Sequence, residues 1–274
     1  MIIDGHSHAC GKFLSPESII SALDFNGFDK VVLVPGELNS TTEYPLPHLA
    51  KVFPKYNVVK ATNVLTKVTM KLTGKVKDIP EGNEYVYHLV SATSNRVIQF
   101  LWITTEIKNT TEYLDKKFAD WQFKGVKLHQ CWESFTIDSK FFNDVANWTG
   151  QNNLPLFIHL YSDSEVKKII QYKREHPNFK LIIAHLFGLE LFIKENYRDD
   201  NLYFDTSTIQ LISDYRIKKA IDFVGAHRIL FGTDTPYGAK DNLSRNLNRI
   251  KSLDISDNDK ALILGLNMKR LLEL

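Results

Sequence analysis

The sequence predicts a single-domain α/β protein that folds as a (β/α)8 barrel. Short apolar runs rich in Val, Ile and Phe recur eight times along the 274 residues, as expected for parallel strands that are buried on both faces. Each run is followed by an amphipathic stretch, which gives the strand-helix alternation of a barrel. An open doubly wound sheet has the same alternation, but the count of eight favours the barrel.

The predicted strands and helices alternate along the whole chain. The strands cover residues 1–3, 31–34, 97–103, 125–128, 154–158, 181–184, 202–204 and 229–231. One helix begins at residue 15, further helices cover residues 84–95, 141–148, 162–175, 217–223 and 241–250, and a last helix begins at residue 256. Pro16 is tolerated at a first helical position, Ser162 and Glu165 form a capping box, and Ser256 with Asp259 opens the C-terminal helix.

The segment of residues 35–82 is long for a connection between a strand and its helix. Its five prolines argue against one continuous element. The segment leaves the carboxyl end of the second strand, which is the side of a barrel where active sites lie. We therefore expect a lid or a substrate-facing excursion, and an inserted packing or oligomerisation element is the alternative.

The composition excludes several classes of protein. The chain has 34 Lys and Arg against 32 Asp and Glu, a net charge of +2, which argues against a main task of binding nucleic acid or an anionic membrane. Two cysteines, Cys10 and Cys131, cannot build a multi-bridge secreted framework. No signal peptide and no run of ~20 apolar residues is visible. We expect a cytoplasmic enzyme with a small-molecule substrate, and a homo-oligomer stays open.

Histidine and aspartate residues gather at the predicted carboxyl ends of the strands. The set consists of His6, His8, His129, His159, His185 and Asp234. In a parallel barrel these ends surround one mouth, and the period of two along a strand puts Asp4 on the same side as His6 and His8. Each residue alone is commonly a satisfied polar group or a helix cap. Together, several imidazoles and a carboxylate suit Zn²⁺, or else Mn²⁺, Fe²⁺ or Co²⁺.

Several segments in order resemble the amidohydrolase superfamily, in particular the branch that includes aminocarboxymuconate-semialdehyde decarboxylase and related hydrolases. They are residues 3–8 (IDGHSH), 125–129 (GVKLH), 155–159 (PLFIH), 183–185 (IAH), 202–207 (LYFDTS) and 229–236 (ILFGTDTP). The ending GLNMKRL resembles that branch's Asn-Ala-x-Arg-Leu terminus, with Met268 where Ala is usual. The resemblance spans nearly the whole chain and is silent on the substrate.

The resemblance implies one divalent metal, with Zn²⁺ favoured. The implied ligands are His6, His8, His159 and Asp234. The implied catalytic residues are Asp234, which takes a proton from water, and His185, which acts as acid, base or polarising group. The glycine-rich turn often found after this histidine is here Leu186-Phe187-Gly188, so the sequence departs from the pattern at that point.

A second metal is the weaker alternative. In other branches of the superfamily a carboxylated lysine on the fourth strand bridges two metals, and Lys127 has that position and the parity of His129. His185 would then become a ligand as well. With one metal, Lys127, His129, Asp205 and Trp132 are expected to contact the substrate or the residues that hold the metal. Asp205 either orients a ligand histidine or caps the next helix.

The predicted function is that of a metal-dependent hydrolase, in which metal-activated water attacks a carbonyl, ester or amide bond of a small molecule. The alternative among enzymes is the metal-dependent, non-oxidative decarboxylation of an aromatic or unsaturated carboxylic acid at the same site. The alternative outside enzymes is a metal-binding, ligand-sensing barrel without turnover. His185 and Asp234 together argue against the sensor, because a sensor needs no proton shuttle.

Overall fold

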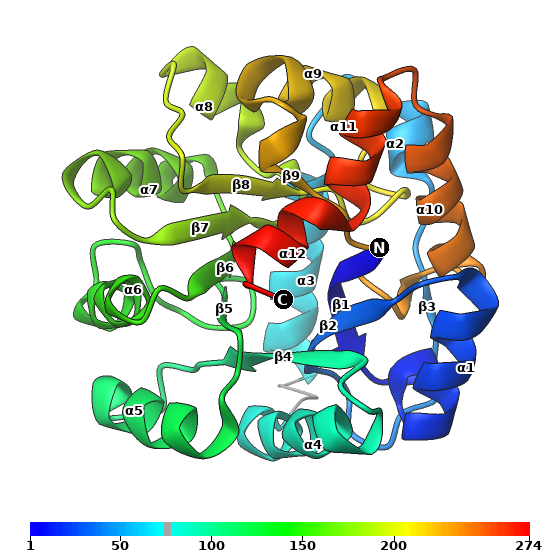
Figure 1. The fold of residues 1–274 in the computed structure, drawn as a ribbon. Helices are drawn as coiled ribbons and strands as arrows, with labels where there is room; N and C mark the ends of the chain where they lie inside the picture. Colours follow the sequence, from blue (N-terminus) through cyan, green and yellow to red (C-terminus); the bar gives the residue numbers. More distant parts are fainter. Residues whose placement is uncertain (74–77) are drawn as a thin grey trace.

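Within residues 1–73 and 78–274, which the computed structural model describes, eight parallel strands form the centre of the molecule (Figure 1). Their order around the sheet is β1-β2-β4-β5-β6-β7-β8-β9. The strands are β1 (Ile3–Ala9), β2 (Lys30–Pro35), β4 (Val97–Trp102), β5 (Gly125–His129), β6 (Pro155–His159), β7 (Lys180–Ile183), β8 (Leu202–Asp205) and β9 (Ile229–Leu230). The predicted (β/α)8 barrel is confirmed.

Backbone hydrogen bonds close the sheet between β1 and the segment that follows β9. The N–H of His8 donates to the carbonyl of Thr235 at 2.8 Å, and the N–H of Asp234 donates to the carbonyl of His6 at 2.7 Å. The last strand is therefore joined to the first strand at the level of its two histidines. This closure brings residues from opposite ends of the chain into contact at one mouth of the barrel.

Helices surround the strands on the outside, and the last helix lies across the front of the barrel (Figure 1). They are α1 (Pro16–Asn26), α4 (Ile79–Ala92), α5 (Thr110–Trp121), α6 (Lys140–Gln151), α7 (Asp163–Glu175), α8 (Leu189–Lys194), α9 (Asp214–Val224), α10 (Asn242–Ser252), α11 (Asp257–Ala261) and α12 (Asn267–Leu271). Ser162 caps α7 as predicted, but the carboxylate of Glu165 accepts hydrogen bonds from Gln130 and Ile137 instead of completing the capping box. Among the described residues, no helix has both the length and the apolar character of a membrane span.

The first strand differs from its prediction. It begins at Ile3 and runs to Ala9, so the two histidines lie inside the strand and not after it. The pairing with β2 shifts between Asp4 and Ser7, which is the effect of a bulge. Asp4 consequently bonds to the hydroxyls of Ser7 and Thr233 and does not share the side of His6 and His8. The apolar run of residues 1–3 gave too short a strand, because the length of β1 depends on its pairing with the neighbouring strands and not on local hydrophobicity alone.

The excursion also differs from its predicted extent. Helix α4 begins at Ile79, because Asp78 caps it by accepting the N–H of Glu81 at 3.0 Å. The described part of the excursion contains β3 (Tyr44–Pro45), α2 (Leu49–Val52) and α3 (Val59–Thr73). β3 pairs in parallel with β10 (Tyr237–Gly238). In Figure 1, α3 lies behind the barrel and α12 lies in front of it, so the two helices lie at opposite ends of the barrel.

The inside of the barrel is apolar below the mouth. Phe100, Phe157 and Leu230 lie in one buried cluster with Met268 of α12. This cluster excludes water from the lower barrel, and the buried polar side chains described below stand directly above it. Their charges are therefore poorly screened by solvent.

A small residue at position 232 is needed for the mouth to keep its shape. A Cβ at Gly232 would collide with the carboxylate of Asp205 and lie 3.0 Å from the Cβ of His6. We expect Gly232→Ala to lower the free energy of unfolding by about 1–3 kcal/mol, because an overpacked core must shift. Urea denaturation measures this change.

The matched control is Gly150→Ala in α6, where the nearest atom, Cβ of Phe179, is at an ordinary distance of 3.4 Å. This exchange should leave stability unchanged or raise it by up to about 1 kcal/mol, since alanine favours helix. Equal urea midpoints for Gly232→Ala and the unaltered protein would contradict the packing argument.

Candidate metal centre

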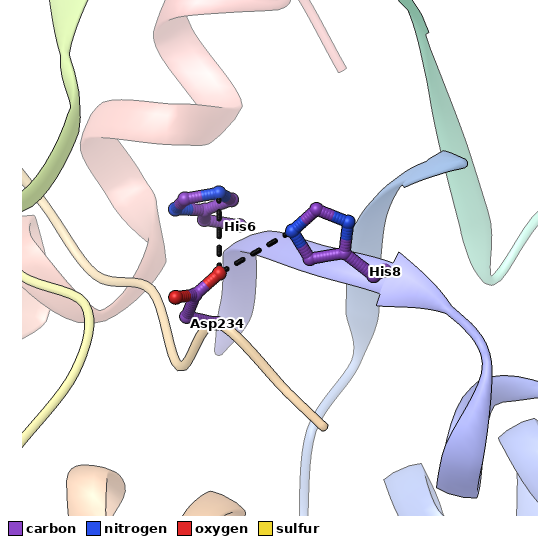
Figure 2. A group of neighbouring side chains, drawn as sticks. All are labelled: His6, His8 and Asp234. Atoms are coloured by element: carbon purple, nitrogen blue, oxygen red, sulfur yellow. Dashed lines mark ion pairs between the residues drawn. The ribbon is translucent and has the colours of Figure 1, made fainter. Parts of the chain in front are cut away.

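Three imidazoles turn the same ring nitrogen toward one carboxylate. His6 and His8 lie on β1, His185 follows β7, and Asp234 follows β9. The Nε2 atoms of His6 and His8 are 3.5 and 3.4 Å from Oδ1 of Asp234, the contacts drawn in Figure 2. The Nε2 atom of His185 is 3.9 Å from the other oxygen, Oδ2. All four side chains are buried.

The opposite nitrogen of each ring is bound by an oxygen atom. Nδ1 of His8 donates to the carbonyl of Pro35 at 2.9 Å, and Nδ1 of His185 donates to the carbonyl of Ser207 at 2.6 Å. A carbonyl oxygen only accepts, so these rings carry their hydrogen on Nδ1 and keep a lone pair on Nε2. Fixing a histidine through its second nitrogen is the usual support of a metal ligand.

Asp205 supplies the corresponding support for His6. Its Oδ2 lies 3.1 Å from Nδ1 of His6 and accepts the backbone N–H of His185 at 3.2 Å, and the hydroxyl of Ser207 also donates to it. Asp205 was expected either to orient a ligand histidine or to cap the next helix, and these contacts match the first role. The cap of the following helix α9 is Ser213.

Burial and neighbouring charges decide which of these groups are ionised. Burial lowers the pKa of His6 well below its ordinary value, and the ammonium of Lys127 lowers it further. Burial alone would raise the pKa of Asp234, but the surrounding imidazoles outweigh it and hold that pKa well below its usual range. At neutral pH the mouth therefore combines the uncharged ring of His6 with an ionised carboxylate. These are the protonation states that a metal requires of its ligands.

Lys127 enters the same space from β5. Its Nζ lies 3.0 Å from Nε2 of His6 and 3.9 Å from the centre of the Phe157 ring. The ammonium donates to the lone pair that a metal at His6 would use. A metal ion at this nitrogen therefore requires Lys127 to move or to lose its positive charge, and carboxylation of the amine is one way to lose it.

His129 is held differently from the other histidines. Its Nδ1 accepts the backbone N–H groups of Cys131 and Trp132 at 3.2 and 3.3 Å, so the hydrogen of the neutral ring is on Nε2. A nitrogen that carries hydrogen donates to a substrate but does not bind a metal. The ring stacks on His159 with 4.0 Å between centres. Its predicted contact with the substrate stays a prediction.

His159, at the end of β6, is not brought into the group around Asp234. Its Nε2 lies 2.7 Å from Oδ1 of Asn63, a residue of α3. Within residues 1–73 and 78–274, two groups of three ligand atoms lie within 4.8 Å of one another, namely His6, His8 and Asp234, and His6, His185 and Asp205. The predicted role of His159 as a metal ligand therefore stays a prediction.

A pocket of about 300 Å³ opens above these residues. It is lined by His6, His8, Glu37, Tyr44, Leu46, Thr62, Asn63, Thr66, His129, Trp132, His159, His185, Leu211, Asp234 and Tyr237. Trp132 was expected here from the sequence, whereas six of the lining residues come from the excursion and were not singled out. The length of the excursion indicated that it could reach the pocket. No spacing rule predicts which of its side chains turn inward.

Glu37 and Tyr237 form the wall beside His8. The hydroxyl of Tyr237 donates to both carboxylate oxygens of Glu37, at 2.7 and 3.0 Å, and its ring meets His8 edge-on at 5.1 Å. Burial, followed by the charge of Glu37, raises the pKa of Tyr237 well above its ordinary value. The phenol therefore remains a hydrogen-bond donor at this wall.

Comparison with known proteins gives a family match and a fold match. The family model described as amidohydrolase matches residues 59–274. Among solved structures, 2,6-dihydroxybenzoate decarboxylase from Rhizobium has a TM-score of 0.70 at 15% identity, covering 99% of this chain and 98% of its own. A probable 2-pyrone-4,6-dicarboxylic acid hydrolase from Acinetobacter baumannii has a TM-score of 0.68 at 13% identity, covering 100% and 99%.

A third solved structure contains a metal. Dihydroxybenzoic acid decarboxylase from Polaromonas sp., with bound manganese and the inhibitor 2-nitroresorcinol, has a TM-score of 0.65 at 14% identity and covers 100% of this chain and 97% of its own. At these identities the structures establish the shared fold alone. Among curated proteins, none matches the sequence.

Replacement of Lys127 separates the one-metal from the two-metal arrangement. With one metal, Lys127→Met should raise zinc affinity at least about tenfold, because it removes a like charge next to the ion. With two metals bridged by a carboxylated lysine, the bound metal should fall from two ions per chain to one. Zinc titration against a competing chelator, with metal analysis, measures both quantities.

The control is Lys168→Met, because Lys168 lies on the surface and pairs with Asp138 at 3.1 Å. Its zinc affinity and metal content should equal those of the unaltered protein. A loss of affinity in Lys127→Met without a change in stoichiometry would contradict both arrangements.

Proposed function

The chain belongs to the amidohydrolase family, and from this membership we propose that it is a metal-dependent hydrolase of a small molecule. The observation that carries the proposal is the convergence of three imidazole lone pairs on the carboxylate of Asp234. A cation placed between these lone pairs and the carboxylate would be attracted by all of them. A buried group of this kind is suited to hold a divalent metal.

The proposed ligands are His6, His8 and Asp234, with His159 as the predicted fourth ligand, and Zn²⁺ is favoured, with Mn²⁺, Fe²⁺ or Co²⁺ as alternatives. His6 and His8 fit a metal because the second nitrogen of each ring is already bound by an oxygen. When bound, such an ion supplies Lewis acidity and brings the pKa of a water molecule down to about 7.

Two proton acceptors stand side by side at the mouth. Oδ1 of Asp234 faces His6 and His8, while Oδ2 lies 3.9 Å from Nε2 of His185. A proton released from water can be taken by either Oδ2 or this nitrogen. His185 becomes a donor to a developing oxyanion only after it has taken that proton, because its resting hydrogen is held by the carbonyl of Ser207. His129, with its hydrogen on Nε2, is a donor from the start.

The wall formed by Glu37 favours hydrolysis over decarboxylation. Glu37 accepts hydrogen bonds on both oxygens, from Tyr237 and from the thiol of Cys10, as an ionised carboxylate does. A substrate carboxylate bound near this wall would meet a like charge, whereas an uncharged ester, lactone or amide would not. Decarboxylation remains the second candidate, because the same fold serves as a decarboxylase in Rhizobium and Polaromonas.

We infer further that the excursion faces the substrate, since Tyr44, Leu46, Thr62 and Thr66 line the pocket with Glu37. Whether it also moves as a lid, or serves association into a homo-oligomer, stays a prediction. The cytoplasmic location expected from the sequence likewise stays a prediction.

A substrate panel on metal-loaded protein tests the proposed reaction. Esters, lactones and amides are followed by acid release with a pH indicator, and aromatic and unsaturated carboxylic acids are followed by CO₂ release. Acid release without CO₂ supports the hydrolase. CO₂ release replaces it by the decarboxylase, and binding without turnover in either panel replaces it by the sensing barrel.

Asp234→Asn should remove most of the activity found in that panel. We expect kcat/KM to fall about 10²- to 10⁴-fold, the usual contribution of a positioned proton acceptor, and metal content to fall because the amide carries no charge. The control Asp138→Asn makes the same exchange at an exposed residue that pairs with Lys168 and should leave both quantities unchanged. Full turnover by Asp234→Asn would falsify the assignment.

A further inference from the structure

A second cavity lies between the excursion and helices α9 and α10. Its volume is about 550 Å³, which is within the range of small-molecule sites. It is lined by residues of the excursion between positions 48 and 54, by the segment of residues 209–215 where α9 begins, and by one side of α10. None of its lining residues lines the pocket above the metal centre. The cavity is therefore a place for a ligand that the proposed reaction does not use.

The side of α10 that faces this cavity carries basic and polar side chains. Its four lining residues have the spacing of one side of a helix and are Arg245, Asn248, Arg249 and Ser252. The excursion adds Lys51, and the start of α9 adds Asp214. Among the described residues that line the cavity, Asp214 is the one carboxylate, against three permanently charged basic side chains. The cavity therefore has an excess of two positive charges, and it suits an anion.

Arg249 is a buried cation that is bound by neutral oxygens. It is only 6% exposed, and its N–H groups donate to the carbonyls of Ile212 at 2.7 Å and Thr206 at 2.8 Å and to the side-chain oxygen of Asn246 at 3.1 Å. Its Nε has no acceptor within the part of the chain that the structure describes. Burial lowers the pKa of Arg249 to about 10, although the carboxylate of Asp214 acts against this shift. A buried charge is costly until it is paired, so an anion in the cavity would be attracted by it.

The surroundings of His48 show that the basic side chains lie close together. His48 lines the cavity directly before α2. Burial lowers the pKa of its imidazole, and the positive charges of Arg245, Lys51 and Arg249 lower it further. The three cations come from two helices, α2 and α10. The packing of the excursion against the barrel therefore brings them together, and they are not one local run of basic residues.

The remaining lining indicates what kind of molecule the anionic group belongs to. Ala50, Pro54, Ile209 and Ile212 give the cavity an apolar part, and the exposed ring of Tyr215 lines it as well. The first turn of α9 also lies here, and the N–H groups of a first helical turn favour an anion. Together these features fit an anionic head group attached to an apolar or aromatic body.

We propose that this cavity is a second binding site, which takes a small phosphate monoester with an apolar or aromatic body. Lys51 and Arg245 bind the phosphate group, Arg249 adds a buried positive charge, and the apolar body packs on Ile209 and Ile212. The excess of two positive charges matches the dianion of a phosphate monoester better than a single carboxylate. Because the site shares no lining residue with the substrate pocket, the inference stands or falls independently of the proposed function.

Titration of the zinc-loaded protein with phenyl phosphate, at an ionic strength of about 0.15 M, tests the proposal. We expect one molecule to bind per chain, at least about tenfold more tightly than inorganic phosphate or phenol, because head group and ring both contribute. The ring protons of His48 should shift in the NMR spectrum. Equal binding of inorganic phosphate would mean an adventitious ion only, and shifts at His8 and His185 without one at His48 would place the ester on the metal centre. Either result would overturn the proposal.

Two substitutions with opposite expected effects test the charges of the cavity. Arg245→Gln should weaken the binding of phenyl phosphate about tenfold, the scale of one hydrogen bond to a charged group. Asp214→Asn should tighten it up to about fivefold, because it removes an exposed like charge beside the phosphate group. Isothermal titration calorimetry measures both affinities. Unchanged affinity in the two variants would refute the proposal.

The matched control is Arg174→Gln. Arg174 pairs with one carboxylate, Glu195 at 3.4 Å, as Arg245 pairs with Asp241 at 3.6 Å, and the two arginines are similarly exposed. It lies on α7 and does not line the cavity, so its substitution should leave the affinity for phenyl phosphate unchanged. A loss equal to that of Arg245→Gln would show that the ester responds only to the net charge of the protein, which would contradict a specific site.

Discussion

The hydrogen bond from the N–H of Asp234 to the carbonyl of His6, at 2.7 Å, is the contact on which the mouth of this barrel depends. It joins the segment after the last strand to the first strand and so closes the sheet. The bond joins the backbones of the same two residues whose side chains face each other. Closing the barrel therefore also brings the ligand side chains together. A barrel that failed to close here would leave the Asp234 carboxylate far from both histidines of β1.

The electrostatics of the mouth follow from this closure. A buried carboxylate is costly unless it is compensated. The three imidazoles around Asp234 turn Nε2 lone pairs toward it, because their Nδ1–H groups donate to Asp205 and to the carbonyls of Pro35 and Ser207. The ammonium of Lys127 lies 3.0 Å from Nε2 of His6. A divalent cation among the Nε2 atoms would be attracted both by these lone pairs and by the carboxylate, which is why the group is suited to a metal.

The sequence predicted the parts of this molecule that follow from local pattern. Buried parallel strands and the gathering of His6, His8, His185 and Asp234 at one mouth follow from apolar runs and strand ends. The extent of β1 and the turning of Asp4 toward Thr233 do not, because they result from a shift of pairing with β2. The contacts of Asn63, Glu37 and Tyr237 were also beyond prediction, since they depend on how a long excursion folds back over strands distant in sequence.

The excursion supplies the part of the pocket wall that the barrel strands themselves do not determine. Strands and closing bonds fix His6, His8 and Asp234, whereas Glu37, Tyr44 and Asn63 reach the same pocket from a segment that is attached to the barrel at several points. One attachment is the pairing of β3 with β10, shortly after Asp234. Another is the side-chain amide of Asn63, which donates to the carbonyls that follow β6. A movement of the segment that broke the bonds of Asn63 would alter the pocket wall, because Thr62, Asn63 and Thr66 of α3 line the pocket. The shape of the substrate pocket therefore depends on how this one helix is held against the barrel.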